Sequence, residues 1–386
     1  MPERMRIGVI SSPVITTPTN AERVPPGWSG SPEQMTAILA DGLYDRGHEV
    51  TLFASGETVT RSNLVSIGAK SSYEDPEIGL GKHKQHEEAL IAKAFATAFD
   101  GSFDILSSGF LFETAGLARI LKKFNKTPTV SVLHSPLGRH PNLPLREIAN
   151  DQSYVALSNK QRLGFEFINF VATIYHGIDN KKFAFNSQGG QEMVVVGRMH
   201  RDKGPHIAVE IAQKLGIKTK LVGSNWGTHN DGRDLYWEKV LDTVNPSVIE
   251  LIGFAENTSS YYQHSKVLLN PIQYEEPFGL TVVESLSCGT PVVAFARGSM
   301  PELIEDGKTG FLVNPDDNDI RGNWAVKKTG TEGLVEAIQR IYGMSNADYI
   351  NMRQLCRKRV ETGFTIEKMI DRYEELFTKL VGVKNQ

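Results

Sequence analysis

Cysteine is scarce in this chain: Cys288 and Cys356 are the only two among 386 residues. Two cysteines cannot build the disulfide framework that holds small secreted domains together, so we expect a reducing compartment. Cys288 directly precedes Gly289, at the expected end of a helix. That position favours a small packed residue over a nucleophile.

Long apolar runs are also missing. A membrane-spanning helix needs about 18 apolar residues in a row, and no stretch of this chain approaches that length. The N-terminus leads at once into the strand-like segment 5–10, without the apolar region and cleavage site of a signal peptide. We therefore expect a cytoplasmic protein.

The chain lacks an excess of charge of either sign. It carries 42 basic and 45 acidic residues, with a formal net charge of -3, which argues against bulk binding of nucleic acid. A basic segment that includes Arg119, Lys122, Lys123 and Lys126 leaves peripheral membrane contact open, although a solvated helix face is favoured. No G-x-G-x-x-G follows the first strand, which counts against a dinucleotide oxidoreductase.

The length predicts two domains, or three by the length rule, and strands alternate with helices along the chain. This alternation predicts an α/β protein with doubly wound parallel sheets, whose ligands bind at the carboxyl ends of the strands. The first helix is expected to begin with Ser31 as N-cap, Pro32 in the first turn and Gln34 closing a capping box. Further helices are expected over 86–99, 113–124, 159–167, 331–342, 346–361 and 366–380.

One stretch, 271–285, organises the rest of the chain. The apolar run 267–269 predicts a buried strand, a turn follows, and a helix is expected from Leu280 to Cys288. The start of such a helix presents unpaired N–H groups and a positive dipole end, which favour a phosphate. Glu276 and Glu284 flank this point, and carboxylates accept hydrogen bonds from sugar hydroxyls.

A second phosphate cradle is predicted where the second domain begins. The strand 193–196 runs into Gly197 and Arg198, and Lys203 stands just before Pro205, which opens a helix. Two cations at a strand–turn–helix junction suit a diphosphate.

The stretch from Glu276 to Gly298, with Pro-Phe-Gly-Leu between the two glutamates, resembles the signature of retaining, nucleotide-sugar-dependent glycosyltransferases of family 4 (group 1 glycosyltransferases). The resemblance covers most of the chain and implies the GT-B fold, in which two Rossmann-like domains face each other across a cleft. It implies an acceptor-binding domain at 1–185, a nucleotide-sugar-binding domain at 186–364, and a C-terminal helix at 365–386 that packs back on the first domain.

The resemblance also implies roles for individual residues. Arg198 and Lys203 are expected to bind the donor pyrophosphate, Glu276 the sugar hydroxyls and Glu284 the ribose, while His134 lies near the reacting centre. Gly253 and Phe254 are expected to lie along the nucleobase. Trp28-Ser29-Gly30 has one glycine where the family has two in the loop over the diphosphate. The predicted catalytic residues are His134, Arg198, Lys203 and Glu276, and the predicted donor site comprises Gly30, Gly197, Arg198, Lys203, Gly253, Phe254, Glu276, Phe278, Gly279, Leu280, Thr281 and Glu284.

The implied reaction moves a hexose from a nucleotide diphosphate sugar to an acceptor hydroxyl with retention, without metal or other cofactor. A UDP-sugar is favoured and GDP-mannose is second. Asp317-Asn318-Asp319 fits a metal-binding D-x-D pattern, but a solvated turn is the preferred interpretation. An epimerase or phosphorylase on the same fold, and a non-catalytic nucleotide-sugar-binding module, remain as alternatives. The acceptor, chosen by first-domain loops, is not readable from the sequence.

Overall fold

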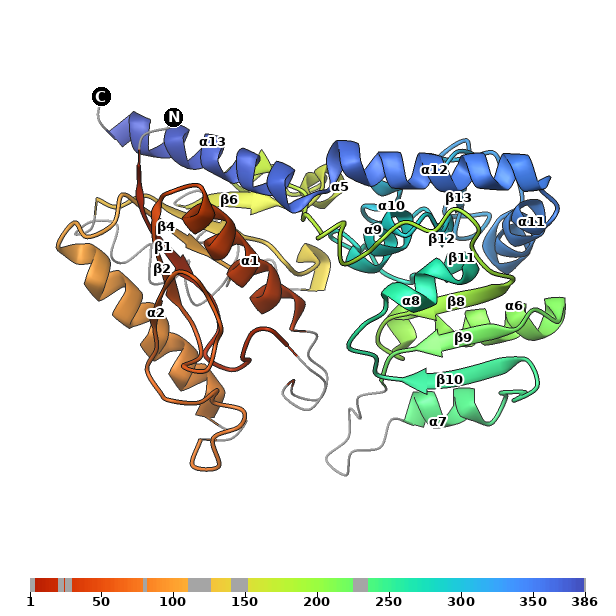
Figure 1. Ribbon diagram of the computed structural model, residues 1–386, viewed down its shortest axis with the longest axis horizontal. Coiled ribbons are helices and arrows are strands. Elements are labelled where there is room, and N and C mark those ends of the chain that lie inside the picture. Colours follow the sequence, from red (N-terminus) through yellow and green to blue (C-terminus); the bar gives the residue numbers. More distant parts are fainter. Residues whose placement is uncertain are drawn as a thin grey trace. The chain divides into compact units, whose positions relative to one another are not determined.

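The structure, a computed structural model, describes residues 4–19, 24, 30–78, 82–109, 126–139, 152–224 and 235–384. The chain divides into two compact units, Met1–His176 with Ile366–Gln386, and Gly177–Thr365. The boundary between the units lies after His176, whereas the sequence predicts it after residue 185. Each unit is a parallel sheet with interleaved helices, so the α/β class predicted from the alternating pattern is confirmed (Figure 1).

The first unit is built on a seven-stranded sheet in the order β3-β2-β1-β4-β5-β6-β7. Every pair of neighbouring strands is parallel, and the order changes direction at β1, as in a doubly wound sheet. The edge strand β3 was missed because three residues are too short to show a periodic pattern. The strands are β1 (Arg6–Ile10), β2 (Glu49–Phe53), β3 (Asn63–Val65), β4 (Ile105–Ser108), β5 (Thr129–Val132), β6 (Ser153–Ala156) and β7 (Phe170–Thr173).

Helices cover both faces of this sheet. Successive residues of a strand point to opposite faces, and in β4 Leu106 packs with α2 (His83–Phe99) while Ser107 lines a pocket with residues of α1 (Ser31–Asp45) and α13 (Ile366–Lys384). The α2 face is apolar, with Phe53 and Phe103 in an edge-to-face contact at 5.9 Å. The buried side chains on that face are Ile10, Phe53, Leu90, Ile91, Ala94, Phe95, Ala98, Phe103 and Leu106.

The last helix, α13, packs on the first unit, as predicted (Figure 1). Its Ile370 lies against Gly42 of α1, where a Cβ would come within 2.5 Å of the Ile370 side chain. Its Glu374 accepts a hydrogen bond from Nε2 of the buried His48 (2.8 Å) and forms an ion pair with Arg46 (3.4 Å). The C-terminal segment is therefore held by both packing and charge.

The second unit has a six-stranded parallel sheet in the order β10-β9-β8-β11-β12-β13. Its central strands are continuous buried apolar runs, which is typical of parallel strands covered on both faces. The strands are β8 (Glu192–Val196), β9 (Thr219–Val222), β10 (Ile249–Gly253), β11 (Ser265–Asn270), β12 (Val292–Phe295) and β13 (Gly310–Val313). The helices are α6 (Pro205–Leu215), α7 (Leu235–Leu241), α8 (Ser259–Gln263), α9 (Leu280–Ser287), α10 (Met300–Leu303), α11 (Gly330–Tyr342) and α12 (Asn346–Gly363).

A fully buried arginine of α12, Arg353, holds the back of the second unit together. Its guanidinium donates to four backbone carbonyls and two hydroxyls, and among the described residues no carboxylate forms an ion pair with it. Two of the carbonyls, those of Gln263 and Cys288, stand at the C-terminal ends of α8 and α9, where a cation is favoured by the helix dipole. The six acceptors are Asn186 O, Gln263 O, Ser265 O, Cys288 O, Thr290 Oγ1 and Tyr349 Oη.

The ends of two helices differ from prediction. The N-cap of α1 is Gly30, not Ser31, and the Gln34 side chain accepts from the N–H of Thr19 (3.2 Å) instead of closing a capping box. The helix expected over 159–167 is only α5 (Asn159–Arg162), because the chain turns at Gly164, where φ is +84°. The helix expected over 113–124 lies outside the described residues.

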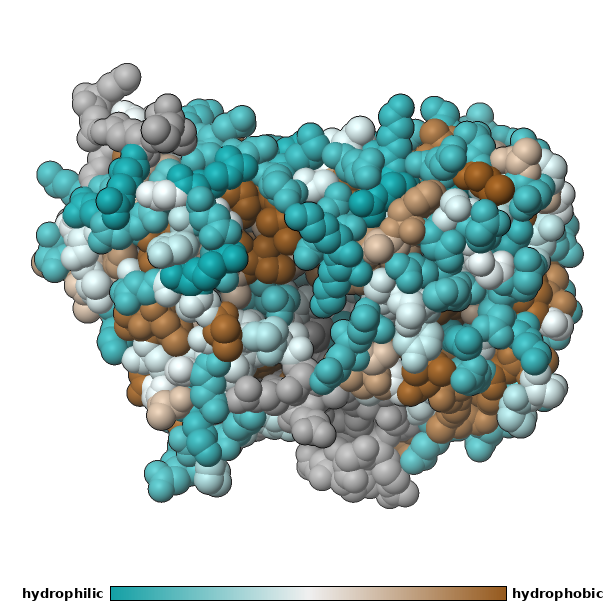
Figure 2. Space-filling view, in the orientation of Figure 1, coloured by the Kyte–Doolittle hydropathy of each residue, from teal (hydrophilic) through white to brown (hydrophobic). Residues whose placement is uncertain are grey.

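The remaining predicted helices and strands are present within a few residues of their expected ends. Cys288 is fully buried, and burial raises the pKa of its thiol to about 12, so its interpretation as a packed residue is confirmed. None of the described helices is both long and apolar enough to cross a membrane. The face drawn in Figure 2 shows apolar areas separated by hydrophilic residues.

Candidate active site

The carboxyl edge of the second sheet brings together the turns that follow β8, β9 and β10. The N–H of Gly197 donates to Val222 O (3.0 Å), and the N–H of Gly223 donates to Gly253 O (2.7 Å). A Cβ on Gly223 would lie 1.8 Å from Gly197 O, so glycine is required for this close approach. Phe254, next to Gly253, exposes 41% of its surface at this edge.

The turn after β8 reaches across to the loop after β11. The Asp202 carbonyl accepts from the N–H of Gln273 (2.7 Å). Gly204 has φ +70°, and a Cβ there would lie 2.3 Å from Pro271 O. This tight junction carries Lys203 to Glu276, although 73 residues separate them in the chain.

Lys203 and Glu276 form an ion pair, and both side chains are largely buried, with 21% and 14% exposure. Burial opposes the charge on Glu276, but the Lys203 ammonium outweighs it and the pKa of the carboxylate lies below its usual value. Burial likewise opposes the Lys203 charge, yet Glu276 raises its pKa. Tyr274 donates its hydroxyl to Oε2 of Glu276 (2.6 Å), the same oxygen that Lys203 binds. The site therefore keeps both charges in place.

The helix α9 begins beside this pair. Gly279 is its N-cap with φ +104°, and among the described residues no side chain caps the helix. Phe278 is buried against Phe364, with ring centroids 6.0 Å apart, so its side chain is part of the core and only its backbone can serve a ligand. The first N–H groups of a helix have no partner within it. The start of α9, with Leu280 and Thr281, therefore presents N–H groups without helical partners, and phosphate binding there stays a prediction.

Glu284 is the fifth residue of α9, about one turn past its start, as predicted. Its Oε2 accepts a hydrogen bond from the buried hydroxyl of Tyr262 (2.9 Å). Burial raises the pKa of Glu284, against the opposing effects of the Tyr262 hydrogen bond and of Lys182.

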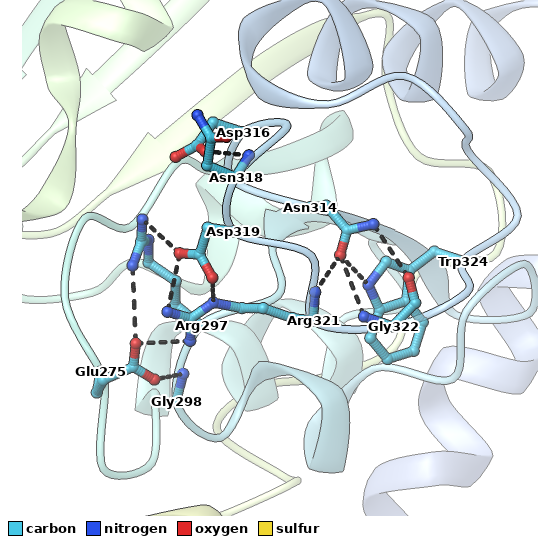
Figure 3. Close-up of polar contacts among 10 residues, drawn as sticks. All are labelled: Glu275, Arg297, Gly298, Asn314, Asp316, Asn318, Asp319, Arg321, Gly322 and Trp324. Carbon is cyan, nitrogen blue, oxygen red and sulfur yellow. Dashed lines mark hydrogen bonds and ion pairs between the residues drawn. The ribbon is translucent and has the colours of Figure 1, made fainter.

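A network of two arginines and two carboxylates fixes the turn that carries Glu276 (Figure 3). Glu275 Oε1 accepts from Arg321 (2.6 Å), and its Oε2 accepts from the N–H of Gly298 (2.7 Å). Asp319 bonds Arg321 through both oxygens (2.7 and 3.0 Å) and pairs with Arg297 (3.2 Å). At Gly298, where φ is +54°, a Cβ would lie 2.2 Å from the carbonyl oxygen of Glu276.

The loop that carries Arg321 is held by Asn314, at the end of β13. The Asn314 side-chain oxygen accepts from the N–H groups of Arg321 (2.8 Å) and Gly322 (3.2 Å) and from the indole of Trp324 (3.1 Å) (Figure 3). Three donors on one oxygen give the loop a defined shape, so that Arg321 arrives at Glu275 already oriented.

The prediction of a solvated turn at Asp317–Asp319 is wrong for Asp319. Its two carboxylate oxygens are bound by Arg321 and Arg297, as described above. Asp319 of this pattern therefore belongs to the network behind Glu276. In the part of the chain that the structure describes, no group of three or more His, Cys, Asp or Glu side chains is placed to hold a metal ion.

His134 belongs to the first unit, directly after β5. Its ring stacks on that of His176 at a centroid distance of 5.2 Å and an interplanar angle of 18°. Burial lowers the pKa of His134 to about 4, and burial and the neighbouring His134 lower that of His176. Both imidazoles are thus neutral near pH 7. They line a small pocket with Thr36, Ser107, Met369 and Tyr373.

A family model described as Glycosyl transferases group 1 matches residues 178–329. A D-inositol 3-phosphate glycosyltransferase of Mycolicibacterium smegmatis is 33% identical over 334 residues, which cover 73% of this chain and 74% of that protein. The chain belongs to the group 1 glycosyltransferases. Spore coat protein SA of Bacillus subtilis matches over a shorter stretch, 25% identical over 173 residues, so that the chain spans only 45% of its length.

Solved structures of other proteins share the fold. Sucrose-phosphate synthase from Thermosynechococcus elongatus has a TM-score of 0.74 at 19% identity, covering 98% of this chain and 100% of that one. HepE of Anabaena, in complex with UDP and glucose, has a TM-score of 0.69 at 18% identity, covering 96% and 99%. At these identities the likeness concerns the fold, which is the GT-B type with two Rossmann-like domains.

Most of the predicted donor residues of this group 1 glycosyltransferase lie on one edge of the second sheet. His134 and Gly30 lie in the first unit. Gly30 has φ +65°, and a Cβ there would lie 2.8 Å from Thr19. The conformation at the N-cap of α1 is therefore sufficient to explain a glycine at this position. Trp28 and Ser29 lie outside the described residues.

Sequence reasoning missed several residues that surround Glu276 in this family member. Tyr274 precedes Glu276 by two residues, and its place in the same turn was the one signal available. Glu275, Arg297 and Arg321 gave no local signal, because their contacts join segments that are far apart in the chain.

Proposed function

We propose that this protein is a retaining glycosyltransferase that moves a hexose from a nucleotide diphosphate sugar, with a UDP-sugar favoured, to an acceptor hydroxyl. The observation that carries the proposal is the ionised Lys203–Glu276 pair beside the uncapped start of α9. The name of the Mycolicibacterium relative and the UDP and glucose bound to HepE support the same class of reaction.

The departing diphosphate is the first requirement of this chemistry. Lys203 pairs with Glu276, and Arg198, two residues after β8, is a second cation that lowers the pKa of Glu276. We propose that both cations bind the diphosphate together with the start of α9, whose N–H groups and dipole favour phosphate oxygens. Fixed donors of this kind stabilise charge as it develops without reorganisation. We propose that they make a divalent metal unnecessary.

The sugar is the second requirement. The transition state is oxocarbenium-like, so groups that orient the ring matter as much as those that hold the leaving group. Glu276 is ionised and held by two donors on Oε2, so it can accept hydrogen bonds from sugar hydroxyls. Backbone groups at Phe278 and Gly279 assist it, and Glu284 accepts from the ribose.

The first unit is proposed to bind the acceptor. His134 is neutral near pH 7 because burial lowers its pKa to about 4. A neutral imidazole can orient a hydroxyl through one donor and one acceptor nitrogen without attracting a counter-ion. We assign no enzyme nucleophile, and retention would follow from attack on the face that the diphosphate leaves.

Thermal unfolding with a panel of nucleotides and nucleotide sugars tests the donor site. A ligand at a hundredfold its Kd adds about 2.7 kcal/mol to the free energy of unfolding. We expect UDP and a UDP-hexose to stabilise the wild type without added metal, and Arg198→Ala to abolish the shift. Arg340→Ala, which removes an exposed arginine paired with Glu336 on α11, serves as the control and should keep the shift. Absence of any nucleotide effect would refute the donor site.

Turnover then separates the possible reactions. A transferase releases nucleoside diphosphate only when an acceptor alcohol is present, and NMR of the product shows the same anomeric configuration as the donor. Release with phosphate as the acceptor would indicate a phosphorylase, and conversion of donor alone an epimerase. Binding without any turnover would indicate a binding module. Activity that survives a chelator supports the metal-independent mechanism.

A further inference from the structure

Two side chains donate to one oxygen of Glu276. Lys203 and the hydroxyl of Tyr274 both donate to Oε2, and the Lys203 ammonium lies 5.2 Å from the centre of the Tyr274 ring. Burial raises the pKa of Tyr274 to about 12, against the opposing effect of Lys203. The phenol is therefore protonated at neutral pH and acts as a donor to the carboxylate.

The two donors respond differently to a diphosphate. An ammonium is a mobile point charge on a flexible stem, and a diphosphate offers it more negative charge than one carboxylate. The neutral phenol lacks this attraction, and its short side chain belongs to the same turn as Glu276. When Lys203 turns to the diphosphate, Glu276 loses its counter-ion but keeps the Tyr274 hydroxyl.

We propose that Tyr274 is a positioning residue: its hydroxyl holds Glu276 on Oε2 while the donor occupies Lys203, so that the carboxylate stays ionised and turned toward the sugar. The proposal rests on the proposed function and adds to it a residue outside the motif that carried the family resemblance. Tyr274 acts through Glu276 and does not itself need to contact the donor.

The backbone of the turn has other anchors. Glu275 is bound by Arg321 and by the N–H of Gly298 (Figure 3), and the carbonyl of Glu276 accepts from the N–H of Ser299 (2.9 Å). None of these bonds involves the Tyr274 hydroxyl. Removing that hydroxyl therefore should leave the turn folded, which separates positioning from stability.

The test compares Tyr274→Phe with Tyr342→Phe. Tyr342 lies at the end of α11, and its hydroxyl donates to the carbonyl of Gln191 (2.8 Å). The control variant therefore loses one hydroxyl group outside the site. The measurements are the Kd of UDP, kcat and KM for UDP-glucose across pH, and Tm. GDP and GDP-mannose are used if the panel selects them.

For Tyr274→Phe we expect kcat/KM to fall about tenfold, the loss of one hydrogen bond to a charged group. The Kd of UDP should stay within about twofold, because Lys203 and α9 still bind the diphosphate. The Tyr274 hydrogen bond lowers the pKa of Glu276, so its loss should move the acidic limb of kcat/KM to higher pH. Tyr342→Phe should leave all three quantities unchanged.

Two results would overturn this proposal and leave the proposed function standing. One is an unchanged kcat/KM in Tyr274→Phe, and the other is a parallel loss of UDP affinity and Tm with no movement of the acidic limb, which indicates a structural role. If the wild type binds no nucleoside diphosphate at all, the proposed function fails and this proposal fails with it.

Discussion

The two units differ in how they hold several of their buried titratable groups. In the second unit, buried charges have partners of opposite sign: Lys203 with Glu276 at the site, and arginines with carboxylates behind it. In the first unit Glu374 pairs with Arg46, whereas burial opposes the charge of two other groups. It lowers the pKa of His134 to about 4 and raises that of Glu33 to about 7.

This difference matches the two kinds of ligand that we propose. A nucleoside diphosphate is anionic, and fixed charges in a partly buried site bind it and stabilise it as it leaves. An acceptor alcohol is neutral, and uncharged hydrogen-bonding groups can hold it without the cost of burying an unpaired ion. A substitution of the buried Arg353 is the most severe test of this difference. Substitutions of Glu33 and Arg321 test it in each unit separately.

The largest effect is expected from Arg353→Met. The change keeps most of the side-chain volume and removes the six hydrogen bonds that the buried guanidinium donates. Gln263 O and Cys288 O keep Asn186 as a donor. The loss of six bonds to buried acceptors should still lower the free energy of unfolding by about 3 to 5 kcal/mol. Urea unfolding followed by circular dichroism measures this loss.

The control for Arg353 is Arg340→Met on α11, whose exposed guanidinium pairs with Glu336. An exposed pair of this kind contributes at most about 1 kcal/mol. Similar losses in the two variants would show that the second unit does not depend on partners for its buried charge, and the comparison between the units would fail.

Glu33→Gln tests the uncharged state of the first unit. Burial, and to a smaller extent Glu87, raises the pKa of Glu33 from 4.5 to about 7. Between these two values the folded state keeps a proton that the unfolded state releases, so the free energy of unfolding falls as pH rises and levels off above pH 7. The glutamine cannot ionise. Relative to the wild type, the variant should therefore gain about 3 kcal/mol between pH 4.5 and pH 8.

Chemical denaturation at a series of pH values measures this gain. Glu88 is an exposed glutamate of α2. Glu88→Gln is the matched control, and its free energy of unfolding should follow the wild-type pH dependence. A difference between Glu33→Gln and the wild type that stays constant with pH would mean that Glu33 is ionised in the folded state, which contradicts its assignment to the uncharged group.

Local patterns in the sequence were sufficient for the fold and for part of the site. Buried parallel strands are continuous apolar runs, so β8, β11 and the strands around β1 could be predicted from hydropathy alone. The residues at the start of α9 and in the turn after β8 were found because each group is contiguous in the chain. Which residues bind a donor remains a prediction in both cases.

What the sequence could not reveal depends on contacts between distant segments. Arg321 meets Glu275 across 46 positions, and His134 stacks on His176, although neither member of either pair carries a mark of its partner. The N-cap of α1 was misplaced for a similar reason, because Gln34 is used by Thr19. Tertiary contacts decided each of these outcomes, and periodicity cannot report them.

The smallest effect is expected from Arg321→Gln, which leaves Glu275 with Gly298 and the more distant Arg297 (3.7 Å) as partners. The Glu275 side chain is 47% exposed, so solvent screens its pair with Arg321 and the loss of unfolding free energy should be only about 1 kcal/mol. We expect the turn that carries Glu276 to become less ordered while the second unit stays folded. KM for the nucleotide sugar should therefore rise a few-fold, with kcat nearly unchanged. Steady-state kinetics with Arg340→Gln as control measure it, and an unchanged KM would show that the network behind Glu276 stabilises the unit without positioning the site.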